Sequence, residues 1–111
     1  MTPIDRAVRI CGKQSELARR VTGKPATGYV YHWRTNGVTA QIAAGIENAV
    51  RAAIAESEEC AAVAAKLGGP VRAEELLPDA SVRWIRGESG FITAYEKQLT
   101  PVELEGTAHA H

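Results

Sequence analysis

The sequence predicts an all-α protein, a bundle of four to five helices with an elongated Ala-rich helical segment and a flexible C-terminal tail. Aromatic residues make up only 5% of the chain and alanine supplies much of its 45% hydrophobic share, which suits helices packed closely through small side chains. Apolar residues also recur at spacings of three and four, as on one face of a helix. At 111 residues, the chain can bury one modest core.

Two short helices are predicted at the start of the chain. The first is entered through Thr2-Pro3 and ended by Gly12. Its apolar face is formed by Ile4, Ala7, Val8 and Cys11. In the second helix, polar residues stand between the apolar ones, and the helix ends in Thr22-Gly23. Its apolar face is formed by Leu17, Ala18 and Val21.

A third helix is expected to reach Arg34, with two possible starts. Pro25 can begin it, because a first helical position needs no N–H donor. Thr27 offers an alternative N-cap one turn later. Gly28 then lies inside or at the edge of this helix, where glycine is costly unless the turn or a close approach to DNA requires it.

A long Ala-rich stretch follows the stop at residues 35–37, and Thr39 can cap it. Its stripe alternates steps of four and three through Ile46, Val50, Ala53, Ser57, Cys60, Ala64 and Leu67. The stretch can form one long helix, or two if Ser57-Glu58-Glu59 starts a second one. The stripe suits equally an intramolecular core and a dimer seam.

The chain beyond this stretch is predicted to lose regular structure. Gly68-Gly69-Pro70 ends the helix, and residues 72–77 indicate a single helical turn stopped before Pro78. We expect the domain to span residues 1–86 and the compact part to finish near Trp84. Residues 87–111 mix Gly, Ser, Thr and charges, so they are predicted to form a flexible tail.

Charge is divided unevenly along a chain whose net charge is zero. Residues 1–45 carry seven basic and two acidic residues, and residues 46–111 carry six basic and eleven acidic residues. Unless this is chance clustering, the asymmetry indicates that the first half meets a polyanion.

The second and third helices together fit a helix-turn-helix over residues 14–34. Leu17, Ala18 and Val21 can pack against Val30 and Trp33, which leaves one face of the third helix free for base edges. The candidate base-reading residues on that face are Thr27, Gly28, Tyr31 and His32. The candidate phosphate contacts are Gln14, Lys24 and Arg34, with Arg20 as a further one.

Three segments, IDRAVRICGKQSELARRV, YHWRTNGVTAQIAAGIENA and GGPVRAEELLPD, cover most of residues 4–80. They resemble the YdaS-type, Cro-like family of prophage regulators and candidate antitoxins. The matching motifs span residues 10–19, residues 30–33 and residues 68–79. The resemblance implies a lambda-repressor-like fold and operator binding, and Cro-like proteins typically bind palindromic half-sites as dimers.

The chain departs from the family pattern in three places. Lys13 stands where family members often carry a helix-capping serine. The connection over residues 22–26 is about two residues longer than the usual tight turn, which can shift the third helix relative to the second. An additional segment around residues 51–65 separates two family-like stretches, and its exact place is ambiguous.

Other chemistries lack their sequence signatures. There is no phosphate-binding, dinucleotide-binding or nucleophile-elbow motif, so we expect neither an enzyme nor a cofactor. His32, His109 and His111 have no metal-ligand spacing. No apolar run is long enough to span a membrane, and two distant cysteines without a signal peptide favour the cytoplasm.

The expected partners are a double-stranded DNA operator and a second copy of the chain, as a homodimer. The alternative function is that of an antitoxin or protein-interaction module. Such a module would bind a toxin or another protein mainly through the helical segment at residues 39–67.

Overall fold

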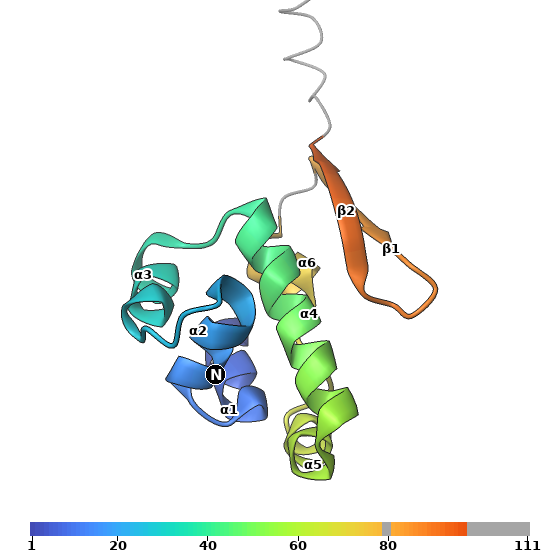
Figure 1. Cartoon of the computed structure of the whole chain (residues 1–111). Coiled ribbons are helices and arrows are strands. Elements are labelled where there is room, and N and C mark those ends of the chain that lie inside the picture. The colour runs from blue at the N-terminus through green and yellow to red at the C-terminus, as the bar shows by residue number, and fades with distance from the viewer. Residues whose placement is uncertain (79–80, 98–111) are drawn as a thin grey trace, which may run out of the picture. The chain divides into compact units, whose positions relative to one another are not determined.

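The computed structural model describes residues 1–78 and 81–97. The chain divides into two compact units, with the boundary between Pro78 and Asp79. Six helices form the described part of the first unit: α1 Pro3–Cys11, α2 Gln14–Thr22, α3 Gly28–Asn36, α4 Ala40–Glu56, α5 Glu58–Lys66 and α6 Ala73–Leu76 (Figure 1). The second unit contains the strands β1 Val82–Arg86 and β2 Ile92–Lys97.

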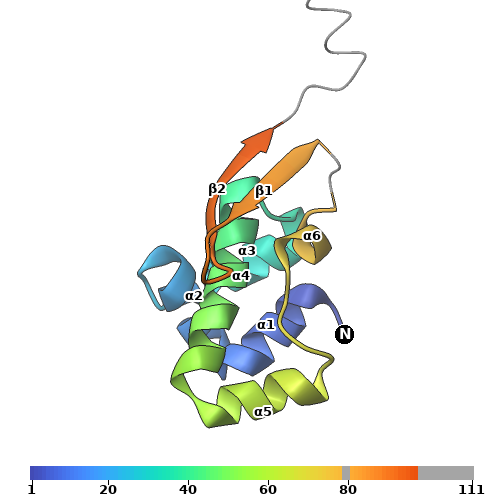
Figure 2. The same cartoon turned by 90° about the vertical axis from the view of Figure 1, so that its right-hand side faces the viewer.

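The α4 helix is the central helix of the first unit. It contacts α1, α2, α5 and α6, and Figure 2 shows α5 lying across the end of α4 beside α1. The side chains of Ile46, Val50 and Ala53 are fully buried in the core that these helices share. The stripe that suited a dimer seam as well as a core therefore lies, over these residues, in the core of the chain itself.

Ser57 separates α4 from α5 and settles the choice between one helix and two. Its backbone is extended, its N–H donates to the Ala53 carbonyl at the end of α4, and its hydroxyl accepts a hydrogen bond from the Cys60 N–H at 3.3 Å. Glu58 and Glu59 occupy the first turn of α5, where carboxylates interact favourably with the helix dipole. The two-helix alternative is the one adopted.

Glu47 is a fully buried carboxylate on α4 that holds the segment carrying α6. One of its oxygens accepts a hydrogen bond from the Ala73 N–H at 2.8 Å, and the other accepts from Arg51 Nε at 3.2 Å. Ala73 begins α6, the single helical turn that the sequence predicts. The contact therefore joins two elements that lie 26 residues apart.

The all-α prediction is wrong, because β1 and β2 form a two-stranded antiparallel sheet, and the described residues contain six helices rather than four to five. Val82, Trp84, Ile85, Thr93 and Tyr95 belong to two short β-branched and aromatic runs. The runs are joined by a five-residue loop, residues 87–91, in which the Gly87 N–H donates to the Phe91 carbonyl at 2.9 Å.

The hairpin register pairs side chains of matching chemistry across the strands. Trp84 stands opposite Tyr95, with their ring centroids 6.0 Å apart, and Arg83 pairs with Glu96 at 3.0 Å. The prediction of a flexible tail from residue 87 is accordingly wrong for residues 87–97, and its remainder lies outside the described residues. The domain limit predicted at residue 86 falls at the end of β1.

Candidate nucleic-acid interface

The α2 and α3 helices are joined by a five-residue turn, residues 23–27. Gly23 ends α2 in the left-handed region, at φ +85°, and its N–H donates to the Arg19 carbonyl at 2.8 Å. The Thr22 hydroxyl donates to the Ala18 carbonyl and accepts from the Lys24 N–H. The α3 helix then starts at Gly28 with Thr27 at its N-cap, so the alternative start at Pro25 is not adopted.

The inward faces of the two helices are those that the sequence predicts. Leu17, Ala18 and Val30 are fully buried, and only 4% of Trp33 is exposed. Val21 packs against the same core while partly buried. This packing fixes the rotation of α3 about its own axis and thereby determines which side chains face outward.

The opposite face of α3 is exposed. Thr27, Gly28 and His32 are exposed, and Tyr31 is the most exposed large hydrophobic side chain of the described residues, at 69%. The Thr27 hydroxyl makes no cap hydrogen bond and has no partner among the described residues. These four positions on one face of the helix thus expose a hydroxyl, a phenol, an imidazole and bare backbone to solvent.

His32 is oriented by its neighbour one turn later. The Asn36 side-chain nitrogen lies 3.0 Å from His32 Nδ1. With the Asn36 amide placed this way, its NH₂ group donates to Nδ1, and the neutral ring then carries its proton on Nε2. In this tautomer His32 offers an N–H donor on an exposed ring.

Gly28 has no structural requirement for glycine. Its φ is not in the left-handed region, and a Cβ added there would meet nothing within 4 Å. Together with Ala26, Tyr29 and His32 it borders an open hollow on the protein surface. Neither the turn nor internal packing explains why glycine stands at this position. The remaining explanation is that a molecule approaching from outside needs the space.

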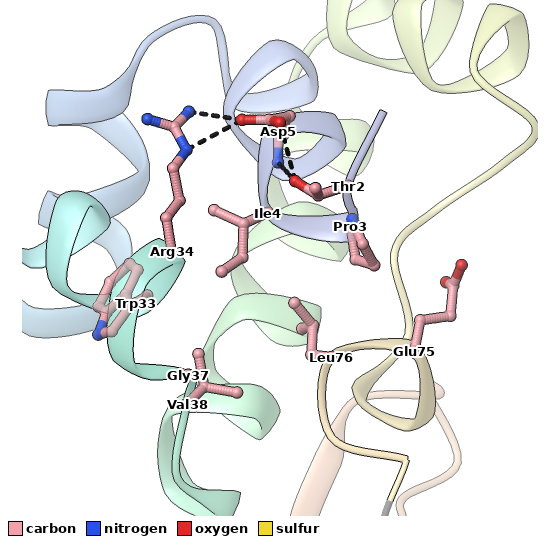
Figure 3. A pocket seen from close by; sticks show the side chains of 10 residues that line it. All are labelled: Thr2, Pro3, Ile4, Asp5, Trp33, Arg34, Gly37, Val38, Glu75 and Leu76. Carbon is pink, nitrogen blue, oxygen red and sulfur yellow. Dashed lines mark hydrogen bonds and ion pairs between the residues drawn. The ribbon is translucent and has the colours of Figure 1, made fainter.

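Arg34 is bound within the protein rather than free (Figure 3). Its Nε donates to the Asp5 carboxylate at 2.9 Å, and its Nη2 lies 2.7 Å from the same oxygen. The hydrogen bond from the Thr2 hydroxyl and the Arg34 guanidinium together hold the pKa of Asp5 below its ordinary value. The predicted phosphate contact thus connects the end of α3 to the first turn of α1.

The Asp5–Arg34 pair lies at the edge of a cleft of about 220 Å³ between α1, α3 and α6. Figure 3 shows the apolar side chains that line this cleft, which are Pro3, Ile4, Trp33, Val38 and Leu76. Glu75 borders the cleft as well and is paired with Arg6. All three charged residues at the cleft, Asp5, Arg34 and Glu75, have partners of opposite sign, so the cleft is close to neutral.

Most arginines of the basic first half are paired with carboxylates. Arg6 pairs with Glu75, Arg20 pairs with Glu56 at 2.6 Å, and Arg19 pairs with Glu16. The first two pairs join residues of the basic half to residues of the acidic half. These two pairs neutralise two of the five excess positive charges of the first half, and Arg20 is not free to contact a phosphate.

Within residues 1–45, the basic side chains that keep no ion pair with other described residues are those of Arg9, Lys13 and Lys24, and all three are exposed. Lys24 lies in the turn that leads to α3, and Lys13 is the N-cap of α2 without a capping hydrogen bond. Gln14, the first residue of α2, is partly buried. The cations available to a polyanion are thus fewer than the sequence suggests.

Other kinds of site find no support among residues 1–78 and 81–97. No group of three or more His, Cys, Asp or Glu side chains there could hold a metal ion, and His109 and His111 lie outside the described residues. Burial raises the pKa of the Cys11 thiol to about 11. No helix of the described residues is both long enough and apolar enough to cross a membrane.

No protein-family model, curated protein or solved structure matches this chain. The resemblance to the YdaS-type family thus stays a prediction from the sequence.

Proposed function

We propose that the protein is a sequence-specific regulator of transcription, a Cro-like repressor that binds double-stranded DNA in the cytoplasm. The α2–α3 pair would dock on the DNA, with α3 in the major groove. The observation that supports this most directly is the exposed face of α3. On this face the Thr27 hydroxyl has no partner among the described residues, and His32 contacts Asn36. The opposite face of α3 packs in the core through Val30 and Trp33.

The roles proposed for the α3 face follow from the available donors and acceptors. Thr27 and Tyr31 would contact bases through free hydroxyls, and His32 through its Nε2–H. Lys24 and Gln14 would contact phosphates. Arg34 is assigned instead to holding α3 against α1 through Asp5.

DNA binding is tested with the full chain and a pool of duplexes with randomised sequence, from which bound duplexes are recovered and sequenced. We expect one preferred site, with an affinity that falls steeply as salt rises, because bound phosphates release counterions. Failure to retain any duplex at roughly 50 mM salt would contradict the proposal. A site bound as a palindrome would support the homodimer.

Single variants then separate base contacts from phosphate contacts. Tyr31→Ala is expected to lose about 1–3 kcal/mol of discrimination at particular base pairs. Lys24→Gln should weaken all sequences alike and reduce the salt slope by about one. Ala62→Ser, on the exposed face of α5, serves as the control that changes neither property.

The alternative, an antitoxin or protein-interaction module acting through residues 39–67, has less support. The apolar residues Ile46, Val50 and Ala53 are buried in the core, so a partner protein cannot reach them without unfolding the unit. A protein partner would have to bind the exposed surface of the segment, such as Glu58 and Glu59 of α5.

A further inference from the structure

An open hollow beside the start of α3 is lined by Ala26, Gly28, Tyr29 and His32. Alanine is the better helix former, and the structure has room for its Cβ at position 28. Glycine there does not serve the turn, as Gly23 does, since φ at Gly28 is ordinary for any residue. The missing methyl group therefore leaves space for something that approaches from outside.

The walls of this hollow are held in place by contacts within α3. The Tyr29 ring stacks on Trp33, with the centroids 6.3 Å apart and the planes 28° apart, and Trp33 is itself buried. His32 is oriented by Asn36, which leaves its Nε2–H as a donor. The lining thus combines an alanine methyl and an aromatic ring with one nearby N–H donor.

We infer that this hollow receives the 5-methyl group of a thymine in the major groove. Thymine is the base that presents an apolar group there, and its O4 acceptor lies next to that methyl on the same edge. The methyl would contact Ala26 and Tyr29 in the space left by Gly28, and O4 would accept from His32 Nε2–H. Cytosine presents an amino donor where thymine has O4, so it does not match this lining.

This inference rests on the proposed function and goes one step further, to the identity of one recognised base. The test uses the full chain and the duplex that it prefers from the randomised pool. Each thymine of that duplex is replaced in turn by deoxyuridine, which lacks only the methyl group. At one thymine of the site, the replacement should weaken binding about fourfold, the value of one buried methyl group.

Gly28→Ala provides the matching change on the protein. It should weaken binding to the thymine duplex at least as much, because its Cβ occupies the space of the methyl, and its loss on the deoxyuridine duplex should be smaller. Thermal unfolding of Gly28→Ala should be no earlier than that of the unchanged protein. Deoxyuridine placed outside the preferred site is the control on the DNA.

The outcomes distinguish the two proposals. If no duplex is preferred, the proposed function fails and this inference fails with it. If a preferred duplex exists but no thymine is sensitive to loss of its methyl, DNA binding stands and the inference is overturned. It is also overturned if Gly28→Ala folds normally and binds the thymine duplex as tightly as the unchanged protein.

Discussion

Among single residues, Glu47 stands out as the fully buried charged side chain of the described part of the chain. Its carboxylate is fully buried, and its two oxygens accept hydrogen bonds from the Ala73 N–H and from Arg51. A buried charge is tolerated only when it is paired and hydrogen-bonded, and a buried N–H without an acceptor is costly. Glu47 therefore satisfies the first N–H of α6 and needs both partners itself.

Two replacements of Glu47 should distinguish the contribution of its side-chain shape to stability from that of its charge. Glu47→Ala is expected to destabilise the protein by about 3 kcal/mol, because it leaves a cavity and removes the acceptor for the Ala73 N–H. Glu47→Gln keeps an acceptor oxygen and should lose clearly less. Urea unfolding of both variants gives the comparison, and equal stability of Glu47→Ala and the unchanged protein would contradict this role.

The residue contacts that join distant helices could not be predicted from the sequence. Asp5 lies 29 residues before Arg34, and Glu47 lies 26 residues before Ala73. Periodicity identifies which face of a helix is apolar, but it does not indicate which charged side chain of another element lies opposite. The exposed positions Thr27, Gly28, Tyr31 and His32 were predictable because they follow directly from the buried Val30 and Trp33.

At the scale of elements, α2 begins without a cap. Lys13 occupies its N-cap position with φ −160° and ψ 165°, and its carbonyl accepts from the Leu17 N–H at 3.2 Å, but its side chain caps nothing. The extended backbone is the one that a capping residue adopts. An unpaired N–H group in the first turn of α2 is therefore left to water.

Lys13→Ser is expected to stabilise the protein by about 1 kcal/mol, since its hydroxyl can accept from an N–H of the first turn. Lys13→Ala removes the same charge without supplying a cap and is the matched control. The measurement is the urea midpoint of each variant. The expectation fails if the serine and alanine variants unfold at the same urea concentration.

Helices were more predictable than strands in this chain, for a physical reason. The apolar faces of α1 and α2 repeat over two or more turns, and glycines end both helices. The hairpin runs are five and six residues long and carry Arg83, Glu96 and Lys97 among their apolar residues. Their pairing depends on register across the loop, which composition does not reveal.

At the scale of the whole molecule, ion pairs connect helices that are distant in sequence. Arg6–Glu75 joins α1 to α6, Arg20–Glu56 joins α2 to the end of α4, and Asp5–Arg34 joins α1 to α3. A charge asymmetry counted along the chain was an incomplete guide to the surface for this reason. Protonation of these carboxylates should therefore lower the stability of the folded protein.

Stability is expected to fall in acid. The hydrogen bond from Thr2 lowers the pKa of Asp5, and although burial raises the pKa of Glu75, hydrogen bonds from the Arg72 backbone and from Arg6 lower it overall. A carboxyl with a lowered pKa contributes stability above its ordinary value, 3.8 for Asp5 and 4.5 for Glu75, and loses it as pH falls through the folded-state pKa.

The measurement is the urea midpoint as a function of pH. We expect little change between about pH 5 and 7 and a decline below about pH 4. In Asp5→Asn the neutral midpoint should be lower and the decline shallower, because this group no longer takes up a proton. A decline as steep as that of the unchanged protein would show that Asp5 does not contribute.

The Ser57 corner has a consequence for how this chain can change in length. One residue ends α4 and caps α5, so an insertion there would separate these two roles and shift α5, whose Ala64 is buried in the core. The turn over residues 23–27, between α2 and α3, is exposed at every position and can take up an added residue without moving a buried side chain. Variation in length among natural or designed versions of the chain is therefore expected in that turn and not at Ser57.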